Sequence, residues 1–158
     1  MADEQVEFAD QVRPHLPAMA ALAARLAGPS DRDDVVQEAL ARAWRKRATY
    51  DPERGTLRVW LLAIVADRAR RMRRRRPDHL RLADVPAVSV PAADPVGVDV
   101  ERALATLPRR MRMAVDCHYF VGLTVAETAA VMGVAEGTVK STMADARARL
   151  RTLLEVTA

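Results

Sequence analysis

Apolar residues recur at every third or fourth position along most of the chain, a spacing that predicts α-helices throughout and an all-α fold. In the first segment, residues 4–26, the positions in register are Phe8, Val12, Leu16, Met19, Leu22 and Leu26. Pro14 and Pro17 are expected to divide this segment into a short helix and a longer one, because proline lacks the backbone N–H that a helix interior needs. Gly28, which a proline follows, is expected to end the longer helix.

Two more helices are predicted before Pro77. The first opens at Ser30, which stands three residues before Asp33 in an N-capping arrangement. Its apolar stripe consists of Val35, Val36, Ala39, Leu40, Ala43 and Trp44. After a turn at residues 50–55, Thr56 is expected to cap a long helix that Pro77 ends. The inner face of this long helix consists of Leu57, Trp60, Leu61, Ile64, Val65 and Met72.

The stretch 83–100 interrupts the helical pattern with three prolines, one glycine and no basic residue. Such a composition is typical of an extended, flexible linker. The sequence therefore predicts two small helical domains, residues 1–78 and 101–158, joined by a linker at residues 79–100.

The second domain is predicted to begin with two helices. The first covers residues 99–107. Pro108 favours the first turn of the next helix, and Gly122 is expected to end it. The residues at successive fourth positions of that helix are Met111, Val115 and Tyr119.

A helix-turn-helix is predicted to follow. Thr124 and Glu127 have the spacing of a capping box that starts a helix, residues 133–135 form a tight turn, and a final helix covers residues 136–154. The core of this module is expected to consist of Val125, Ala129, Val134, Val139 and Met143. A three-residue turn between two helices is the geometry that places the second helix in a DNA major groove, although any helical hairpin shares this outline.

The net charge of +4 is unevenly distributed along the chain. Residues 1–40 carry a net charge of −5, residues 41–82 of +10, residues 83–101 of −4 and residues 102–158 of +3. Seven of the nine residues from 68 to 76 are arginines, whose mutual repulsion is relieved when a polyanion binds. Two basic blocks separated by an acidic spacer indicate two surfaces for nucleic acid, and the acidic first segment indicates a protein partner.

The sequence contains no recognisable catalytic or cofactor-binding arrangement. It has no glycine-rich phosphate loop, no His/Asp/Glu cluster at ligand spacing and no nucleophile beside a base, so we expect no enzyme, no cofactor and no metal. Cys117 is the single cysteine and is interpreted as a buried structural residue. No apolar run reaches the roughly 18 residues of a membrane span, and the first ten residues carry four acidic and no basic side chains, opposite to a secretory signal. We therefore expect a cytoplasmic protein without membrane insertion.

Three segments resemble conserved parts of the extracytoplasmic-function (ECF) RNA polymerase sigma factors of the sigma-70 family. DRDDVVQEALARAWRKR (31–47) resembles the helix by which this family binds the polymerase clamp, and DPERGTLRVWLLAIVADRARRMRRRR (51–76) resembles the segment that reads and melts the minus-ten element. Residues 107–150 resemble the helix-turn-helix that reads the minus-35 element. The resemblance implies a sigma region 2 helical bundle and a sigma region 4 helix-turn-helix in an alternative sigma factor. Such a factor binds core RNA polymerase, directs it to promoter DNA, assists strand opening and is controlled by an anti-sigma factor.

The resemblance also assigns roles to individual residues. The expected polymerase contacts are Asp34, Gln37, Glu38 and Arg42. The residues expected at minus-ten DNA are Tyr50, Arg54, Trp60, Arg70, Arg71, Arg73 and Arg74, with the 50–55 loop as the pocket for an unstacked base. Because Trp60 lies on the apolar stripe, core packing is favoured over base stacking for its ring. The residues expected at the minus-35 element are Thr138, Lys140, Ser141, Ala144 and Arg147.

Three residues depart from the family pattern. Asp67 replaces a common asparagine near the end of the minus-ten helix, and Thr142 and Asp145 stand where arginine is common in the recognition helix. Either Asp145 pairs with Arg149 and faces away from DNA, or it reads a cytosine amine, or DNA binding is weak. Two other functions stay open at this point: a stand-alone helix-turn-helix transcription regulator, and a sigma mimic that sequesters an anti-sigma factor.

Overall fold

The computed structural model describes residues 1–75 and 95–157. These residues are helical for most of their length and contain no strand, which confirms the predicted all-α fold. The helices form two compact units, the first built on residues 1–75 and the second on most of residues 95–157. Of the predicted linker, residues 79–100, the part at residues 79–94 lies outside the described residues. Within the described ranges, no helix combines the length and the apolar character that crossing a membrane requires.

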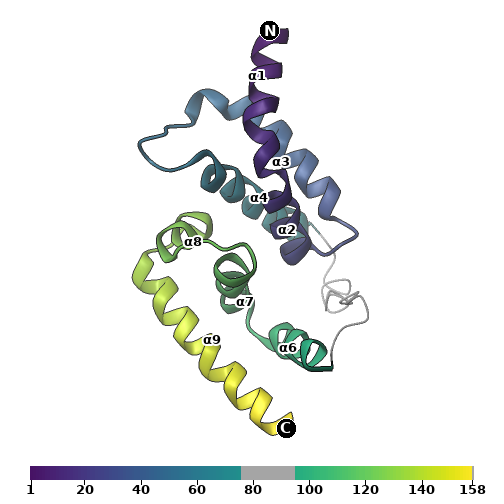
Figure 1. Ribbon diagram of the computed structural model, residues 1–158, viewed down its shortest axis with the longest axis vertical. Coiled ribbons are helices and arrows are strands. Elements are labelled where there is room, and N and C mark those ends of the chain that lie inside the picture. Colours follow the sequence, from purple (N-terminus) through teal and green to yellow (C-terminus); the bar gives the residue numbers. More distant parts are fainter. Residues whose placement is uncertain (76–94, 158) are drawn as a thin grey trace. The chain divides into compact units, whose positions relative to one another are not determined.

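Within residues 1–75, the first unit contains four α-helices and two short 3-10 turns. They are α1 (Ala2–Val12), the turn Arg13–His15, α2 (Leu16–Ala27), α3 (Arg32–Lys46), the turn Arg47–Thr49 and α4 (Leu57–Arg74) (Figure 1). The turn at Pro14 confirms the predicted break in the first segment. The helix α2 ends where predicted, because Gly28 adopts φ 91°, a left-handed conformation that favours glycine.

The beginning of α3 differs from the prediction. Asp31, and not Ser30, occupies the N-cap position, and its side chain makes no capping hydrogen bond. Asp33 and Asp34 lie in the first turn instead, where their charges stabilise the positive end of the helix dipole. The helix α4, in contrast, is capped as predicted, because the Val59 backbone N–H donates to Thr56 Oγ1 over 3.3 Å.

The helices α2, α3 and α4 pack together around one core. Their buried side chains include Met19, Leu22 and Ala23 of α2, Val35, Ala39 and Ala43 of α3, and Leu61, Leu62, Val65, Ala66 and Ala69 of α4. Alanines at the contact allow neighbouring helices to lie close together. Because α4 contacts both α2 and α3, its buried face is wider than the stripe predicted from the sequence.

The helix α1 is attached to α3 by an aromatic contact. The rings of Phe8 and Trp44 meet edge to face with centroids 5.3 Å apart. The Arg47 guanidinium lies 3.8 Å from the centre of the Trp44 ring and pairs with Glu4 over 3.6 Å. The N-terminal end of α1 extends past the other helices of this unit (Figure 1). Arg47 is therefore part of the attachment of α1 to its unit.

The second unit contains α6 (Pro95–Thr106), α7 (Arg109–Val115), a π-helical turn (Asp116–Phe120), α8 (Val125–Met132) and α9 (Glu136–Thr157). The helix α6 begins four residues before its predicted start, inside the stretch expected as linker, and Pro95 occupies its first position. The long helix α9 packs against α6 and α7. The core between them consists of Leu104, Leu107, Val115 and Ala146, with Val100, Met111 and Leu150 packed against it.

The sequence predicted one continuous helix between Pro108 and Gly122. In the structure, α7 ends at Val115 and the π-helical turn follows it. The Val121 backbone N–H donates to the Asp116 carbonyl over 3.0 Å, a hydrogen bond that spans one residue more than in an α-helix. The extra residue changes the register of the helix, and Tyr119, at the fourth position after Val115, is 56% exposed.

Cys117 lies in this turn and is buried, which confirms its interpretation as a structural residue. Burial, and secondly the neighbouring charge of Asp116, raise the pKa of the Cys117 thiol to about 12. The thiol is therefore protonated at neutral pH and is a poor nucleophile.

Candidate nucleic-acid interface

The helix-turn-helix is stabilised at the start of α8 and in the turn before α9. The Thr124 backbone N–H donates to Glu127 Oε2 over 2.8 Å, and the Glu127 backbone N–H donates to Thr124 Oγ1 over 3.1 Å, which confirms the capping box. Gly133 adopts φ 68° in the turn, where a side chain would be strained. These local signals determine where α9 begins.

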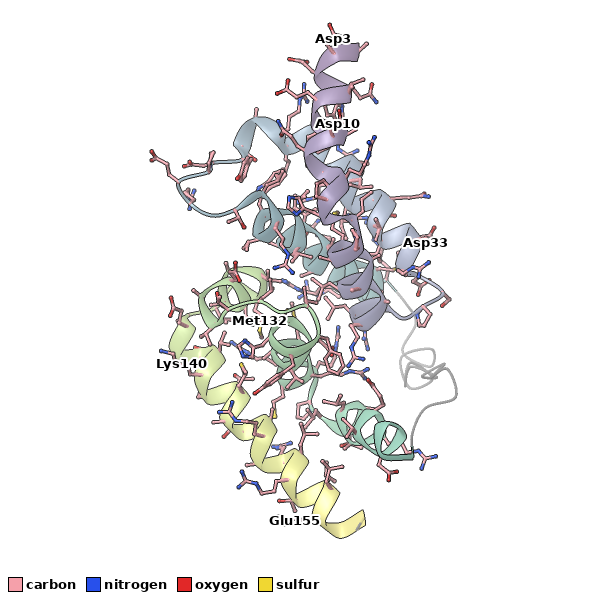
Figure 2. The ribbon with its side chains drawn as sticks, in the orientation of Figure 1. Asp3, Asp10, Asp33, Met132, Lys140 and Glu155 are labelled. Atoms are coloured by element: carbon pink, nitrogen blue, oxygen red, sulfur yellow. The ribbon has the colours of Figure 1, made fainter. Side chains whose placement is uncertain are left out.

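Four of the five residues predicted at the minus-35 element have exposed side chains on α9: Lys140, Ser141, Ala144 and Arg147. Thr138 is half-buried, and its carbonyl accepts a hydrogen bond from Ser141 Oγ over 3.0 Å. Lys140 lies near the N-terminal end of α9 (Figure 2). On the opposite side of the helix, Val139 and Met143 are buried as predicted. The structure therefore brings this set together on one surface, with Thr138 at its edge.

Tyr119 is a neighbour of this surface that the sequence did not indicate. Its hydroxyl accepts a hydrogen bond from the Arg147 guanidinium over 3.4 Å. The Tyr119 ring meets the His118 ring edge to face at 4.9 Å, and His118 Nδ1 donates to the Leu123 carbonyl over 2.7 Å. These contacts link the Arg147 side chain of α9 to the π-helical turn that contains Tyr119. They depend on the π-helical turn, which residue spacing did not reveal.

Two departures from the family pattern, Thr142 and Asp145, also lie on α9. Thr142 is half-buried and Asp145 is exposed. Within the described residues, the predicted alternative of an ion pair between Asp145 and Arg149 does not form. Asp145 therefore presents its carboxylate to solvent on the recognition helix.

The arginines at the end of α4 serve two different purposes. Arg73 is half-buried, and its guanidinium donates to the Leu26 carbonyl at the end of α2 over 3.2 Å. Arg68 is 16% exposed and pairs with Glu38 of α3. The side chains that remain exposed near the end of this helix include those of Arg70, Arg74 and Arg75. The run of arginines at residues 68–76 therefore includes Arg68 and Arg73, which join helices, and other arginines whose side chains are exposed.

Asp67 lies between two guanidinium groups. Its Oδ2 is 2.9 Å from Nε of Arg71 on the same helix and 3.8 Å from a terminal nitrogen of Arg42 on α3. The carboxylate that departs from the family pattern is therefore balanced by cations of its own unit. Arg71, expected to contact DNA, is engaged in this pair while its side chain is half exposed.

The residues predicted to contact polymerase, Asp34, Gln37, Glu38 and Arg42, recur along one side of α3. Asp34 and Gln37 are exposed, whereas Glu38 and Arg42 pair with Arg68 and Asp67 of α4. Two ion pairs thus join the predicted polymerase-binding helix to the helix predicted to contact minus-ten DNA.

The loop between α3 and α4 is held by its own hydrogen bonds. The Tyr50 hydroxyl donates to the Gly55 carbonyl over 3.2 Å, and Asp51 Oδ1 accepts from the Glu53 backbone N–H over 3.0 Å. The Tyr50 ring lies 5.5 Å from the half-buried Trp60 ring, measured between centroids. The loop therefore has a defined shape. Arg54, also predicted at minus-ten DNA, is exposed on it.

Comparison with known proteins identifies the family. The Sigma-70 region 2 family matches residues 11–77, and the Sigma-70 region 4 family matches residues 98–150. The ECF RNA polymerase sigma factor EcfG of Rhodopseudomonas palustris is 31% identical over 154 residues, which cover 93% of this chain and 84% of EcfG. The chain belongs to the ECF sigma factors. This result confirms the family to which the three segments were assigned by resemblance.

Other ECF sigma factors support the same assignment. SigM of Mycobacterium tuberculosis is 39% identical over 127 residues, 78% of this chain, and the match covers 64% of the length of SigM. Among solved structures, the sigma factor RpoE of Bartonella quintana, in complex with the anti-sigma factor NepR, is 28% identical with a TM-score of 0.74. That match covers 96% of this ECF sigma factor and 99% of RpoE.

Proposed function

We propose that this ECF sigma factor is an alternative specificity subunit that binds core RNA polymerase, directs it to specific promoters and assists strand opening. The observation that carries the proposal is that one chain matches sigma-70 regions 2 and 4 in order, each over a helical unit with exposed cations. The protein performs no catalytic step of its own and acts in the cytoplasm. This function needs no cofactor, and within the described residues no three His, Cys, Asp or Glu side chains gather as a metal site requires.

The two units have separate tasks in this proposal. Residues 1–78 bind polymerase and minus-ten DNA, and residues 101–158 bind the minus-35 element. Residues 79–100 are the linker that joins the two units. On α3, the exposed Asp34 and Gln37 support polymerase docking, together with the parts of Glu38 and Arg42 that their ion pairs leave accessible.

Strand opening requires phosphate neutralisation and a place for an unstacked base. The exposed arginines of α4 supply the first, because each cation that meets a phosphate releases a bound counterion. The hydrogen-bonded loop at residues 50–55 supplies the second, with Arg54 exposed on it and the Tyr50 and Trp60 rings at its base.

An anti-sigma factor is the proposed regulatory partner. The similar RpoE structure contains the anti-sigma factor NepR. We infer that a protein of this class binds the present chain as well.

The test of the function is transcription from genomic fragments by purified core RNA polymerase of the source bacterium, with and without this protein. New discrete transcripts that require the protein are expected, and their start sites will define both promoter elements. Absence of such transcripts, together with absence of binding to core enzyme, would contradict the proposal. Tight operator binding without polymerase would then favour a stand-alone regulator, and binding only to an anti-sigma factor would favour a sigma mimic.

Lys140→Ala is expected to weaken recognition of the minus-35 element by about 1–3 kcal/mol, the usual contribution of a base contact. We expect this loss because the Lys140 ammonium is exposed near the start of α9. The measurement compares holoenzyme binding to promoters with an intact and a scrambled minus-35 element at physiological salt. Lys46→Ala, at an exposed lysine of α3, is the matched control and should leave this ratio unchanged. Undiminished discrimination by the Lys140 variant would disprove its role.

A further inference from the structure

The exposed face of α9 carries a carboxylate in an unusual position for a helix that meets DNA. Asp145 lies in the third turn of α9, and its side chain is exposed. Within the described part of the chain, its carboxylate makes no hydrogen bond or ion pair, neither with Arg149 nor with any other residue. The carboxylate is therefore available to a ligand of the recognition helix.

Small side chains lie beside this carboxylate on the exposed surface. They recur at intervals of three or four residues and thus follow one face of α9: Gly137, Ser141, Ala144 and Ala148, all exposed. Because successive residues of a helix are rotated by about 100°, Lys140 and Arg147 flank this face on one side and Asp145 flanks it on the other. Short side chains allow the helix axis to approach the base edges closely, so a side chain as short as aspartate reaches them.

A carboxylate in a major groove discriminates strongly among the bases. Phosphate oxygens repel it, and so do the O6 and N7 atoms of guanine and the O4 atom of thymine, which are all acceptors. The groups from which it can accept a hydrogen bond are the amino groups of cytosine and adenine. Cytosine presents its N4 amine without the neighbouring N7 acceptor that adenine carries, so cytosine is the base that a carboxylate tolerates best.

We propose that Asp145 is a specificity-determining residue that accepts a hydrogen bond from the N4 amine of a cytosine in the minus-35 element. The inference rests on the proposed sigma-factor function and makes it more specific. The cations on the other flank of α9 offset the repulsion between the carboxylate and the DNA, and Tyr119 holds one of them, Arg147, in place.

The test is selection of binding sequences from random duplex DNA by holoenzyme, reconstituted from core polymerase and either the unmodified chain or an Asp145 variant. The unmodified chain is expected to select a cytosine at one position of the upstream element. Asp145→Ala should reduce the preference for that cytosine about tenfold and leave the other positions unchanged. Asp145→Asn should shift the preference at the same position to adenine, because an amide pairs with N6 and N7 of adenine. Asparagine is nearly isosteric with aspartate, so this gain of a new preference cannot result from misfolding.

Glu155→Ala is the matched control, since it removes one exposed carboxylate from the other end of the same helix (Figure 2). It should leave the selected sequence unchanged. The inference is overturned if Asp145→Ala strengthens binding to all sequences equally, because the carboxylate then only repels phosphate. If the unmodified holoenzyme enriches no sequence at all, the sigma-factor function itself fails, and this result is distinct from a selected sequence that does not depend on Asp145.

Discussion

Replacing Arg70, Arg74 and Arg75 together with glutamine is expected to weaken promoter binding on the order of 100-fold at about 0.15 M salt. These arginines are exposed at the end of α4, beside others that hold helices together. Each phosphate contact releases roughly 0.9 of a counterion, so the slope of log K against log salt should become shallower by about 2.7. The measurement is holoenzyme binding to a promoter fragment over a range of salt concentrations.

Two other exposed arginines of the same unit provide the control. Arg13 pairs with Asp10 over 3.3 Å, and Arg32 pairs with Asp33 over 2.8 Å, so neighbouring acids already balance their charges. Arg13→Gln combined with Arg32→Gln should therefore preserve the salt dependence. An unchanged slope in the α4 variant would show that the end of this helix does not meet phosphates.

Leu22→Ala is expected to lower the free energy of unfolding of the first unit by about 2–5 kcal/mol. Leu22 is fully buried on α2, which packs against α3 and α4. A loss of this size is a large fraction of the roughly 5–15 kcal/mol that stabilises a typical domain, so promoter-dependent transcription should decline as well. Both tryptophans of the chain, Trp44 and Trp60, lie in this unit, so their fluorescence during urea unfolding reports on it selectively.

Val6→Ala is the control for Leu22. Val6 is 62% exposed on α1, so its truncation should change the free energy of unfolding by less than about 0.5 kcal/mol. Equal effects of the two substitutions would contradict the assignment of Leu22 to the core.

Asp67 departs from the asparagine that is common in the family, and the fold provides cations that compensate its charge. From the sequence alone, an aspartate in the minus-ten helix predicts repulsion from DNA. In the structure, the carboxylate lies against Arg71 and Arg42, so two cations of the same unit compensate its charge. The resulting link joins α3 to α4, the helices proposed to meet polymerase and DNA respectively. A substitution at Asp67 is therefore expected to affect both surfaces.

The sequence by itself determined the all-α fold, the family and most helix ends. The family follows from the resemblance of three segments to the ECF sigma factors. The fold and the helix ends depend on signals that are local along the chain: apolar spacing, the left-handed Gly28 and Gly133, and the capping box of Thr124 and Glu127. Local signals act within one or two turns of a helix, so they can be identified without knowledge of the packing. The same reasoning failed at Ser30 and in the helix after Pro108, where another cap and a π-helical turn replaced the expected geometry.

Only the tertiary structure decided which charged side chains face solvent. Arg70 and Arg73 belong to one arginine run, yet Arg70 is exposed and Arg73 bonds to Leu26, 47 residues away in the sequence. Similarly, Arg147 is held by Tyr119, 28 residues before it. An ion pair or a hydrogen bond requires two groups within a few ångströms, and helix packing brings such groups together from distant parts of the chain. Periodicity describes one helix at a time and contains no information about these contacts.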